Sequence, residues 1–252
     1  MLLPKPLKRG DKIAFFSPSS PVTVFSQKRF ARAKQYLESK GFELMAGELT
    51  GKSDGYRSGS IQERAAELNA FHQILCQDLD THTYTMPAVW TDFRAEWETQ
   101  DKAKPVYQNE WQFLGSGVVE GRIIGGNLNT MGAIWGSEYM PEIKQSDILL
   151  VEECMLGIET VERSFSLLKA CGIFDRVSAI VLGKHELFND RGTGRTPLDV
   201  LLEVLNGQAV PILSGFDCCH THPMFTLPLG SNCKIDFEQY SISISGDWLN
   251  RD

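Results

Sequence analysis

The second half of the chain alternates short apolar runs with amphipathic helical segments, and this alternation constrains the fold more than any other feature. The runs "DILLVEE" (147–153) and "AIVLG" (179–183) have the length and composition of buried strands. The segment "IETVERSFSLLKACG" after the first run has helical spacing and closes on Gly172. The segment "RTPLDVLLEVLNG" after the second places Thr196 at an N-cap and Pro197 at the first helical position. Strands alternating with helices predict a parallel α/β sheet.

The beginning of the chain predicts a second, smaller α/β arrangement. A strand at 12–16, a helix ending before Gly41 and the short strand "FELMAG" (42–47) follow one another. Ser60 with Glu63 three residues later is the pattern of a capping box. Two strands are too few to close a doubly wound sheet, so this part of the chain looks incomplete.

Composition and hydrophobic pattern divide the chain into three regions. Residues 1–77 form the short α/β start, residues 78–112 an irregular, polar linker or loop region with aromatics, and residues 113–252 a complete α/β domain. Within the last region, "VEGRIIGGNLNTMGAIWG" predicts a strand, a glycine turn and a helix. The alternating "CKIDFEQYSISISG" predicts a hairpin at the sheet edge.

Charge and composition exclude several classes of partner. The formal net charge is −7, and a groove for nucleic acid or an anionic membrane surface would need a basic face. The start of the chain lacks a signal-peptide apolar region, and the apolar runs are too short to span a bilayer. We therefore expect a cytoplasmic protein whose six cysteines are reduced.

The stretch "FDCCHTHPMFTLPLG" gathers several reactive side chains. His220 and His222 would share one face of a strand, and with Asp217 and the remote His185 they could bind a metal ion. Pro223 disturbs a regular strand, however, and adjacent cysteines rarely chelate one ion. The alternative is that the cysteines fill the core and the histidines are satisfied loop residues.

Polar residues also follow the predicted strands. Glu152 and Glu153 stand at the carboxyl end of a buried strand, where ligands bind in open α/β sheets. A carboxylate there could orient an imidazole, although a surface acid is the commoner reading. The turn containing Gly125, Gly126 and Asn127 could cradle an anion, or could serve tight strand–helix packing.

Two further segments carry candidate ligand contacts. Ser17 and Ser19, in the loop "FFSPSSP", could bind a carboxylate or an oxyanion, or could cap the loop. Trp90 and Trp97 lie in the irregular middle, where exposed tryptophans stack on flat ligands or fill a seam between domains.

Six segments together resemble one known family. They are "GDKIAFFSPSSP", "GYRSGSIQERAAELNAF", "GSGVVEGRIIGGNLNT", "DILLVEE", "AIVLGKHELF" and "CHTHPMFTLPLG". Their order and spacing over nearly the whole chain are similar to those of the LD-carboxypeptidase family of serine peptidases. Within that family, the chain most resembles the microcin C self-immunity peptidases.

The resemblance implies a flavodoxin-like N-terminal domain, here truncated, and a smaller swivelling-type α/β C-terminal domain. It implies a hydrolase with a Ser-His-Glu triad that cleaves an amide next to a free carboxylate, without metal or cofactor. The substrate would be a murein LD-peptide or an acidic aminoacyl-nucleotide antibiotic. His220 and Glu152 match the catalytic histidine and glutamate, and Trp97 resembles an aromatic that stacks on the ligand base. Exposed strand edges and the family habit favour a homodimer.

The chain departs from the family pattern at the nucleophile. The family's serine lies in a Gly-aromatic-Ser-Asp turn, and no such sequence occurs here. The two Ser-Asp pairs, Ser53-Asp54 and Ser146-Asp147, lack that context. The stretch "AFHQILCQDLDTHTYTMP" joins segments that are far apart in relatives. We therefore expect an internal deletion that removes the nucleophile and impairs hydrolysis. The alternative is a non-catalytic ligand-binding or remnant homologue.

Overall fold

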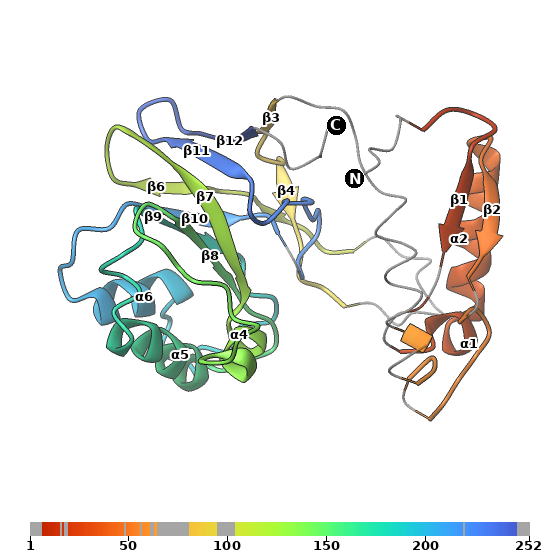
Figure 1. Cartoon of the computed structure of the whole chain (residues 1–252), viewed down its shortest axis with the longest axis horizontal. Coiled ribbons are helices and arrows are strands. Elements are labelled where there is room, and N and C mark those ends of the chain that lie inside the picture. Colours follow the sequence, from red (N-terminus) through yellow and green to blue (C-terminus); the bar gives the residue numbers. More distant parts are fainter. Residues whose placement is uncertain are drawn as a thin grey trace. The chain divides into compact units, whose positions relative to one another are not determined.

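The computed structural model of the chain divides into two compact units (Figure 1). The first unit comprises Met1–Leu79, Arg94–Ala103 and Leu249–Asp252, and the second comprises Asp80–Phe93 and Lys104–Trp248. The structure describes residues 7–15, 17, 20–47, 49–55, 57–60, 63–64, 81–94, 104–218 and 220–245.

In its described part, the first unit contains a two-stranded parallel sheet. Strands β1 (Lys12–Phe15) and β2 (Glu43–Ala46) pair in parallel and are connected by α1 (Val22–Phe25) and α2 (Gln27–Ser39). The connection ends as predicted at Gly41, whose φ of +89° strains any residue with a side chain. Neither helix has a buried residue.

The capping box predicted in the first unit is also present. The Ser60 amide donates to the Glu63 carboxylate at 2.8 Å, and the Glu63 amide donates to the Ser60 hydroxyl at 3.2 Å. The helix expected beyond Arg64 lies outside the described residues.

The second unit is built on an eight-stranded mixed sheet with the order β3-β12-β11-β7-β8-β9-β10-β6. Strands β7 to β10 are parallel to one another, and the flanking strands pair antiparallel. The bounds are β3 (Thr81–Tyr84), β6 (Gln112–Leu114), β7 (Val118–Asn127), β8 (Ile148–Glu152), β9 (Ala179–Gly183), β10 (Ile212–Phe216), β11 (Asn232–Asp236) and β12 (Ser241–Ser245). A separate pair joins β4 (Val89–Trp90) to β5 (Tyr107–Gln108).

Apolar side chains are buried on both faces of this sheet. Helices α4 (Leu128–Ile134), α5 (Ile158–Ala170) and α6 (Pro197–Leu205) cover one face (Figure 1). Their apolar sides pack on alternate residues of the parallel strands, and a second cluster fills the other face. Strands β8 and β9 are buried along their whole length, as their continuous apolar sequences predict for parallel strands.

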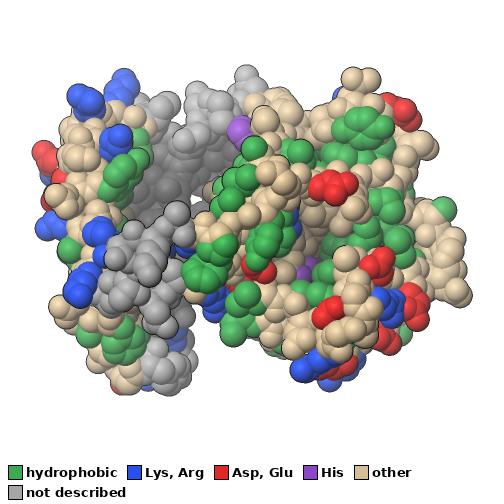
Figure 2. Space-filling view, turned by 180° about the vertical axis from the view of Figure 1, so that it is seen from behind, with side chains coloured by type: hydrophobic (Ala, Val, Ile, Leu, Met, Phe, Trp, Pro, Cys, Tyr) green, Lys and Arg blue, Asp and Glu red, His purple; other side chains and the backbone are tan. Residues whose placement is uncertain are grey.

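Charge is distributed unevenly between the units. On the face shown in Figure 2, Lys and Arg side chains gather mainly on the first unit and Asp and Glu mainly on the second.

No helix in the described part of the chain is long and apolar enough to cross a bilayer.

Three details differ from the sequence-based expectations. The region 78–112 was expected to be an irregular linker with at most short strand pieces, and it contains the pair β4 and β5 and also β3, which is an edge strand of the large sheet. Three of the four β3 side chains are exposed, so that strand carries almost no apolar signal. The predicted hairpin β11–β12 forms, but it lies inside the sheet because β3 pairs with its outer strand.

The third difference is at Gly125 and Gly126, where a turn was expected and β7 instead continues to Asn127. A Cβ on Gly125 would lie 1.9 Å from the Leu150 carbonyl oxygen. The glycine is therefore required by the close approach of β8 to β7, rather than by a turn or by strand–helix packing.

Candidate active site

Parallel strands β7 and β8 bring their carboxyl ends to the same edge of the sheet. Asn127 and Glu152, the last residues of these strands, lie opposite each other in the ladder. Glu152 is 1% exposed, and Glu153 directly after it is also buried. A buried carboxylate at this edge needs hydrogen-bond donors, and both glutamates have them.

Glu152 pairs with His220. The His220 Nδ1 lies 2.7 Å from Glu152 Oε2, and the imidazole comes from the loop that follows β10. Because a carboxylate accepts, Nδ1 carries the proton and Nε2 is left with a free lone pair. The His220 side chain is 38% exposed, whereas that of Glu152 is buried. The pair therefore presents an oriented proton acceptor at the surface of the unit, backed by a buried negative charge.

A glycine on the neighbouring strand leaves room for this pair. A Cβ on Gly183 would lie 2.9 Å from the Glu152 Cβ and 2.6 Å from the Cys218 sulfur. Cys218 is itself buried beside the strand end, in agreement with its reading as a core residue.

Glu153 has a different role from Glu152. Its carboxylate accepts from Asn127 Nδ2 at 2.7 Å, from the Asn129 amide at 2.8 Å and from the Cys154 amide at 3.0 Å. It thus satisfies free donors at the start of α4. The strand-end pattern alone does not separate the two glutamates, whereas the family resemblance selects Glu152, and the structure places Glu152 against His220.

Asn127 is engaged at both ends of its side-chain amide. Its Oδ1 accepts from the amide and the hydroxyl of Thr130, both at 3.0 Å, so it is the N-cap of α4. Its Nδ2 is the donor to Glu153. These contacts explain Asn127 structurally, and its role in ligand binding, like that of Gly125 and Gly126, stays a prediction.

The other predicted ligand contacts are Ser17, Ser19, Trp90 and Trp97. Ser17 is buried in the first unit, and its carbonyl accepts from the Ser58 hydroxyl. Ser19 and Trp97 lie outside the described residues. Trp90 lies in β4, half-buried, with its ring 5.4 Å from that of Tyr107.

The proposed metal ligand Asp217 is committed to other partners. Its carboxylate accepts from Lys184, Asn109 and Trp111, and the residue has no exposed surface. The backbone of the neighbouring His222 pairs with Thr91 in an isolated bridge. Across the described ranges, no group of three or more His, Cys, Asp or Glu side chains could hold a metal ion.

Sequence reasoning missed Lys184 and took His185 only as a remote metal ligand. Both follow directly after β9, so the strand-end rule applied to Glu152 could have found them. Burial lowers the pKa of Lys184, and its ion pair with Asp217 opposes that shift. Burial also lowers the pKa of His185 to about 4, so this imidazole is neutral near pH 7. Its Nδ1 donates to the Gly183 carbonyl at 3.1 Å.

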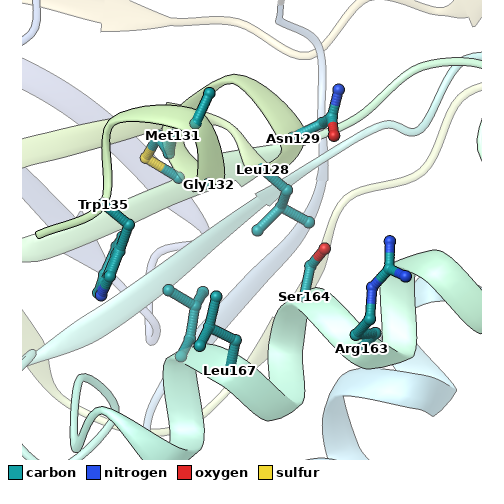
Figure 3. A pocket seen from close by; sticks show the side chains of 10 residues that line it. Leu128, Asn129, Met131, Gly132, Trp135, Arg163, Ser164 and Leu167 are labelled. Atoms are coloured by element: carbon teal, nitrogen blue, oxygen red, sulfur yellow. The ribbon is translucent and has the colours of Figure 1, made fainter.

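Two of the cavities in the second unit have volumes of about 450 Å³ or more. One, of about 480 Å³, is lined by Trp90, Lys184, His185, Phe188 and the start of α6, among others. The other, of about 450 Å³, lies between α4 and α5. In Figure 3, Trp135 and Leu167 stand at one end of this second cavity, and Asn129 and Arg163 at the other. Neither cavity is lined by Glu152 or His220.

Comparison with known proteins identifies the family. Profiles of the LD-carboxypeptidase N-terminal and C-terminal domains match residues 13–74 and 120–235. A Vibrio cholerae protein named as a carboxypeptidase is 47% identical over 331 aligned positions, covering 99% of this chain and 99% of the relative. The chain belongs to the LD-carboxypeptidase family. The microcin C7 self-immunity protein MccF of Escherichia coli is 40% identical over 334 positions, covering 99% of this chain and 97% of MccF.

Solved structures agree with this membership in the LD-carboxypeptidase family. MccF in complex with glutamyl sulfamoyl guanosine has a TM-score of 0.90 and 39% identity, covering 99% of this chain and all of the other. MccF with aspartyl sulfamoyl adenosine has a TM-score of 0.89 at the same identity and 99% coverage of this chain, again with all of the other. The mixed α/β fold with a large sheet is therefore that of the family.

The two Ser-Asp pairs of the chain lie in different units, Ser53-Asp54 in the first and Ser146-Asp147 in the second. Ser146 precedes β8, whereas Glu152 ends it, and six residues of extended chain span about 20 Å. Ser146 is thus at the opposite edge of the sheet from His220. Ser53 lies in the first unit, where its hydroxyl is 3.4 Å from the Gly55 carbonyl.

Proposed function

We propose that the chain is a hydrolase of the microcin-immunity type, with its acid–base pair assembled and its serine nucleophile missing. The observation that carries this proposal is the 2.7 Å contact between His220 Nδ1 and Glu152 Oε2 at the carboxyl edge of the sheet. The substrate class is an amide next to a free carboxylate, in an acidic aminoacyl-nucleotide or a murein LD-peptide. The former is favoured by the 40% identity with MccF.

In this proposal, His220 and Glu152 have separate tasks. The free Nε2 of His220 takes the proton of the attacking oxygen and returns it to the leaving nitrogen. The buried carboxylate of Glu152 holds the ring in the Nδ1-protonated tautomer and stabilises the imidazolium that forms. Both tasks need only the second unit.

In this proposal, the missing serine nucleophile is the cause of the reduced turnover. The alignment with the Vibrio relative spans 331 positions, whereas the chain has 252 residues, which supports a missing internal segment. Without a serine beside His220, no acyl-enzyme can form, and only water remains to be activated. Removing the nucleophile of a serine peptidase costs on the order of 10⁴–10⁶-fold in kcat. We expect turnover reduced to that degree.

The test is turnover of aspartyl sulfamoyl adenosine by the purified chain, measured as released aspartate by mass spectrometry, with MccF as the reference enzyme. We expect a rate at least about 10⁴-fold below that of MccF, which falls to background in His220→Ala. His82→Ala is the matched control, because His82 is an exposed histidine on β3 of the same unit. A rate equal to that of MccF would refute the missing nucleophile. A residual rate unaffected by His220→Ala would refute the role of His220.

A murein tetrapeptide ending in a D-amino acid tests the other substrate class. Release of that terminal residue, without release of aspartate from the nucleotide conjugate, would assign the chain to cell-wall peptide trimming. The same His220→Ala and His82→Ala variants apply.

A second candidate is a binding protein that holds the ligand without cutting it. The sequence favours this candidate because it has the glutamate at the end of its strand (Glu152) and the histidine motif (His220), but no Gly-aromatic-Ser-Asp turn. Saturable binding of aspartyl sulfamoyl adenosine in calorimetry, with no product, would support it. If the chain neither binds nor hydrolyses this compound, it would be a remnant of the family that has lost the ligand-binding function as well.

The described sheet of the first unit favours self-association. Within the described ranges, strands β1 and β2 pair only with each other, and we infer that their outer edges offer backbone groups to another chain. We propose a homodimer, which sedimentation equilibrium of the full chain tests. A monomer at all concentrations would exclude it.

A further inference from the structure

The loop that carries His220 begins at a buried carboxylate. Asp217 follows β10 directly and has no exposed surface. Its Oδ1 accepts from Lys184 Nζ at 2.9 Å, and its Oδ2 accepts from Asn109 Nδ2 and Trp111 Nε1, both at 2.8 Å. Three donors thus satisfy both oxygens.

The donors come from two separate parts of the second unit. Lys184 is the first residue after β9, and its ammonium also donates to the Gly215 carbonyl. Asn109 and Trp111 lie between β5 and β6. Asp217 therefore ties the start of the histidine loop both to the end of the central sheet and to the segment 109–111. Its carboxylate is fully occupied and cannot contact a substrate.

The far end of the loop is also fixed. The His222 amide donates to the Thr91 carbonyl at 2.9 Å, and the Thr91 amide donates to the His222 carbonyl at 2.8 Å. The Asp217 carbonyl accepts from the Phe225 amide at 2.9 Å. His220 lies between these anchors, three residues from Asp217 and two from His222.

The two members of the pair need support to different degrees. Glu152 is the last residue of a fully buried strand, and its position is set by the sheet. His220 is on a loop and partly exposed, so the 2.7 Å contact depends on how that loop is held. Hydrogen bonds weaken steeply as distance and angle depart from the optimum, and small displacements of the loop therefore disrupt the pair.

We propose that Asp217 is a positioning residue, which sets His220 against Glu152 through its contacts with Lys184, Asn109 and Trp111. This inference deepens the proposed function and rests on it for the catalytic meaning of the pair. The pairing itself can be measured without any turnover.

The experiment observes the Nδ1 proton of His220 by NMR in the full chain. A proton hydrogen-bonded to a buried carboxylate exchanges slowly and resonates downfield, and its loss in Glu152→Gln assigns the signal. We expect the signal in the unmodified chain and its loss in Asp217→Asn. A folded Asp217→Asn variant that keeps the signal would overturn the proposal.

Asp147→Asn is the matched control. Asp147 is 3% exposed and pairs with Arg122 at 2.7 Å, but at the opposite end of β8 from Glu152. Both substitutions remove the charge of a buried aspartate that forms an ion pair in the same unit, yet only Asp217→Asn should remove the signal. Loss in both variants would mean general destabilisation and would overturn a positioning role.

A milder variant covers the case in which Asp217→Asn fails to fold. Asn109→Ala removes one of the three donors and leaves the ion pair with Lys184. We expect faster exchange of the Nδ1 proton, by about tenfold, with the fold retained. An unchanged exchange rate would count against the proposal. Because these readings need no substrate, they stand even if the chain hydrolyses nothing. Absence of the signal in the unmodified chain would instead refute the pairing on which both proposals rest.

Discussion

Strands β1 and β8 are both short, apolar and parallel to a neighbour, but their surroundings differ. Every residue of β8 is buried, whereas β1 has one exposed and three half-buried residues. Parallel strands are stable when both faces are covered, and the second unit provides helices on one face and a second apolar layer on the other. Among the described residues of the first unit, the buried apolar side chains are Pro21 and Leu49.

The contrast shows that two apolar runs of one chain, which both predict a buried strand, can end with very different burial. The apolar run of β1 predicts a buried strand as clearly as that of β8 does. A run of this kind becomes a core strand only where other strands and helices surround it, and the described part of the first unit has a sheet of two strands. We therefore expect the second unit to be the more stable of the two.

The largest expected effect comes from deleting matched aromatic side chains. Phe165 is fully buried in α5, and Phe165→Ala should lower the free energy of unfolding of the second unit by about 3–5 kcal/mol. Phe30 in α2 is half-buried, with its ring 5.0 Å from that of Phe15. Phe30→Ala should cost the first unit about 1 kcal/mol. Urea unfolding followed by circular dichroism measures both. Equal losses would break the comparison between the units.

Acid should reduce the stability of the second unit through His185. Its pKa is lowered to about 4 by burial, from about 6.5 in an unfolded chain. Between these values the unfolded state binds the proton and the folded state does not, so stability falls as pH decreases through that window. The loss by pH 4 is on the order of 3 kcal/mol.

Urea unfolding at pH 7 and pH 4.5 checks this prediction. His185→Gln should remove most of the pH dependence of the second unit between these values, whereas His82→Gln, at an exposed position, should leave it intact. The difference in stability between the two units should narrow at the lower pH. A slope unchanged in His185→Gln would contradict the prediction.

The smallest expected loss of stability comes from removing the two capping boxes, one in each unit. Thr196→Ala removes the hydroxyl that accepts from the Asp199 amide at 3.2 Å, at a cost of about 1 kcal/mol. Ser60→Ala removes the equivalent acceptor for the Glu63 amide. In calorimetry, Thr196→Ala should lower the Tm of the second unit by about 4 °C and leave the transition of the first unchanged, while Ser60→Ala should do the reverse. A single transition that responds to both variants would show that the units unfold together.

The contact at the candidate site agrees with the sequence, but the residues that support it could not be predicted. The family resemblance names Glu152 and His220 as a pair, and the structure brings them into contact, while their catalytic role stays a prediction. The sequence could not show that Glu153 satisfies the start of α4, that Asp217 holds the histidine loop, or that Lys184 is buried beneath it. These roles depend on contacts between residues more than 20 positions apart.

The sequence by itself determined β7, β8, β9, the hairpin β11–β12 and the helices of the second unit, the caps at Thr196 and Ser60, and the family. Those features depend on short-range periodicity, on the chemistry of helix ends and on motif spacing. The tertiary structure alone decided that β3 forms the edge of the large sheet, that Gly125 is required by the approach of β8, and that Glu153 satisfies the start of α4. The physical reason is that burial and hydrogen-bond partners depend on residues distant in the sequence, and local sequence patterns do not predict which distant residues come into contact.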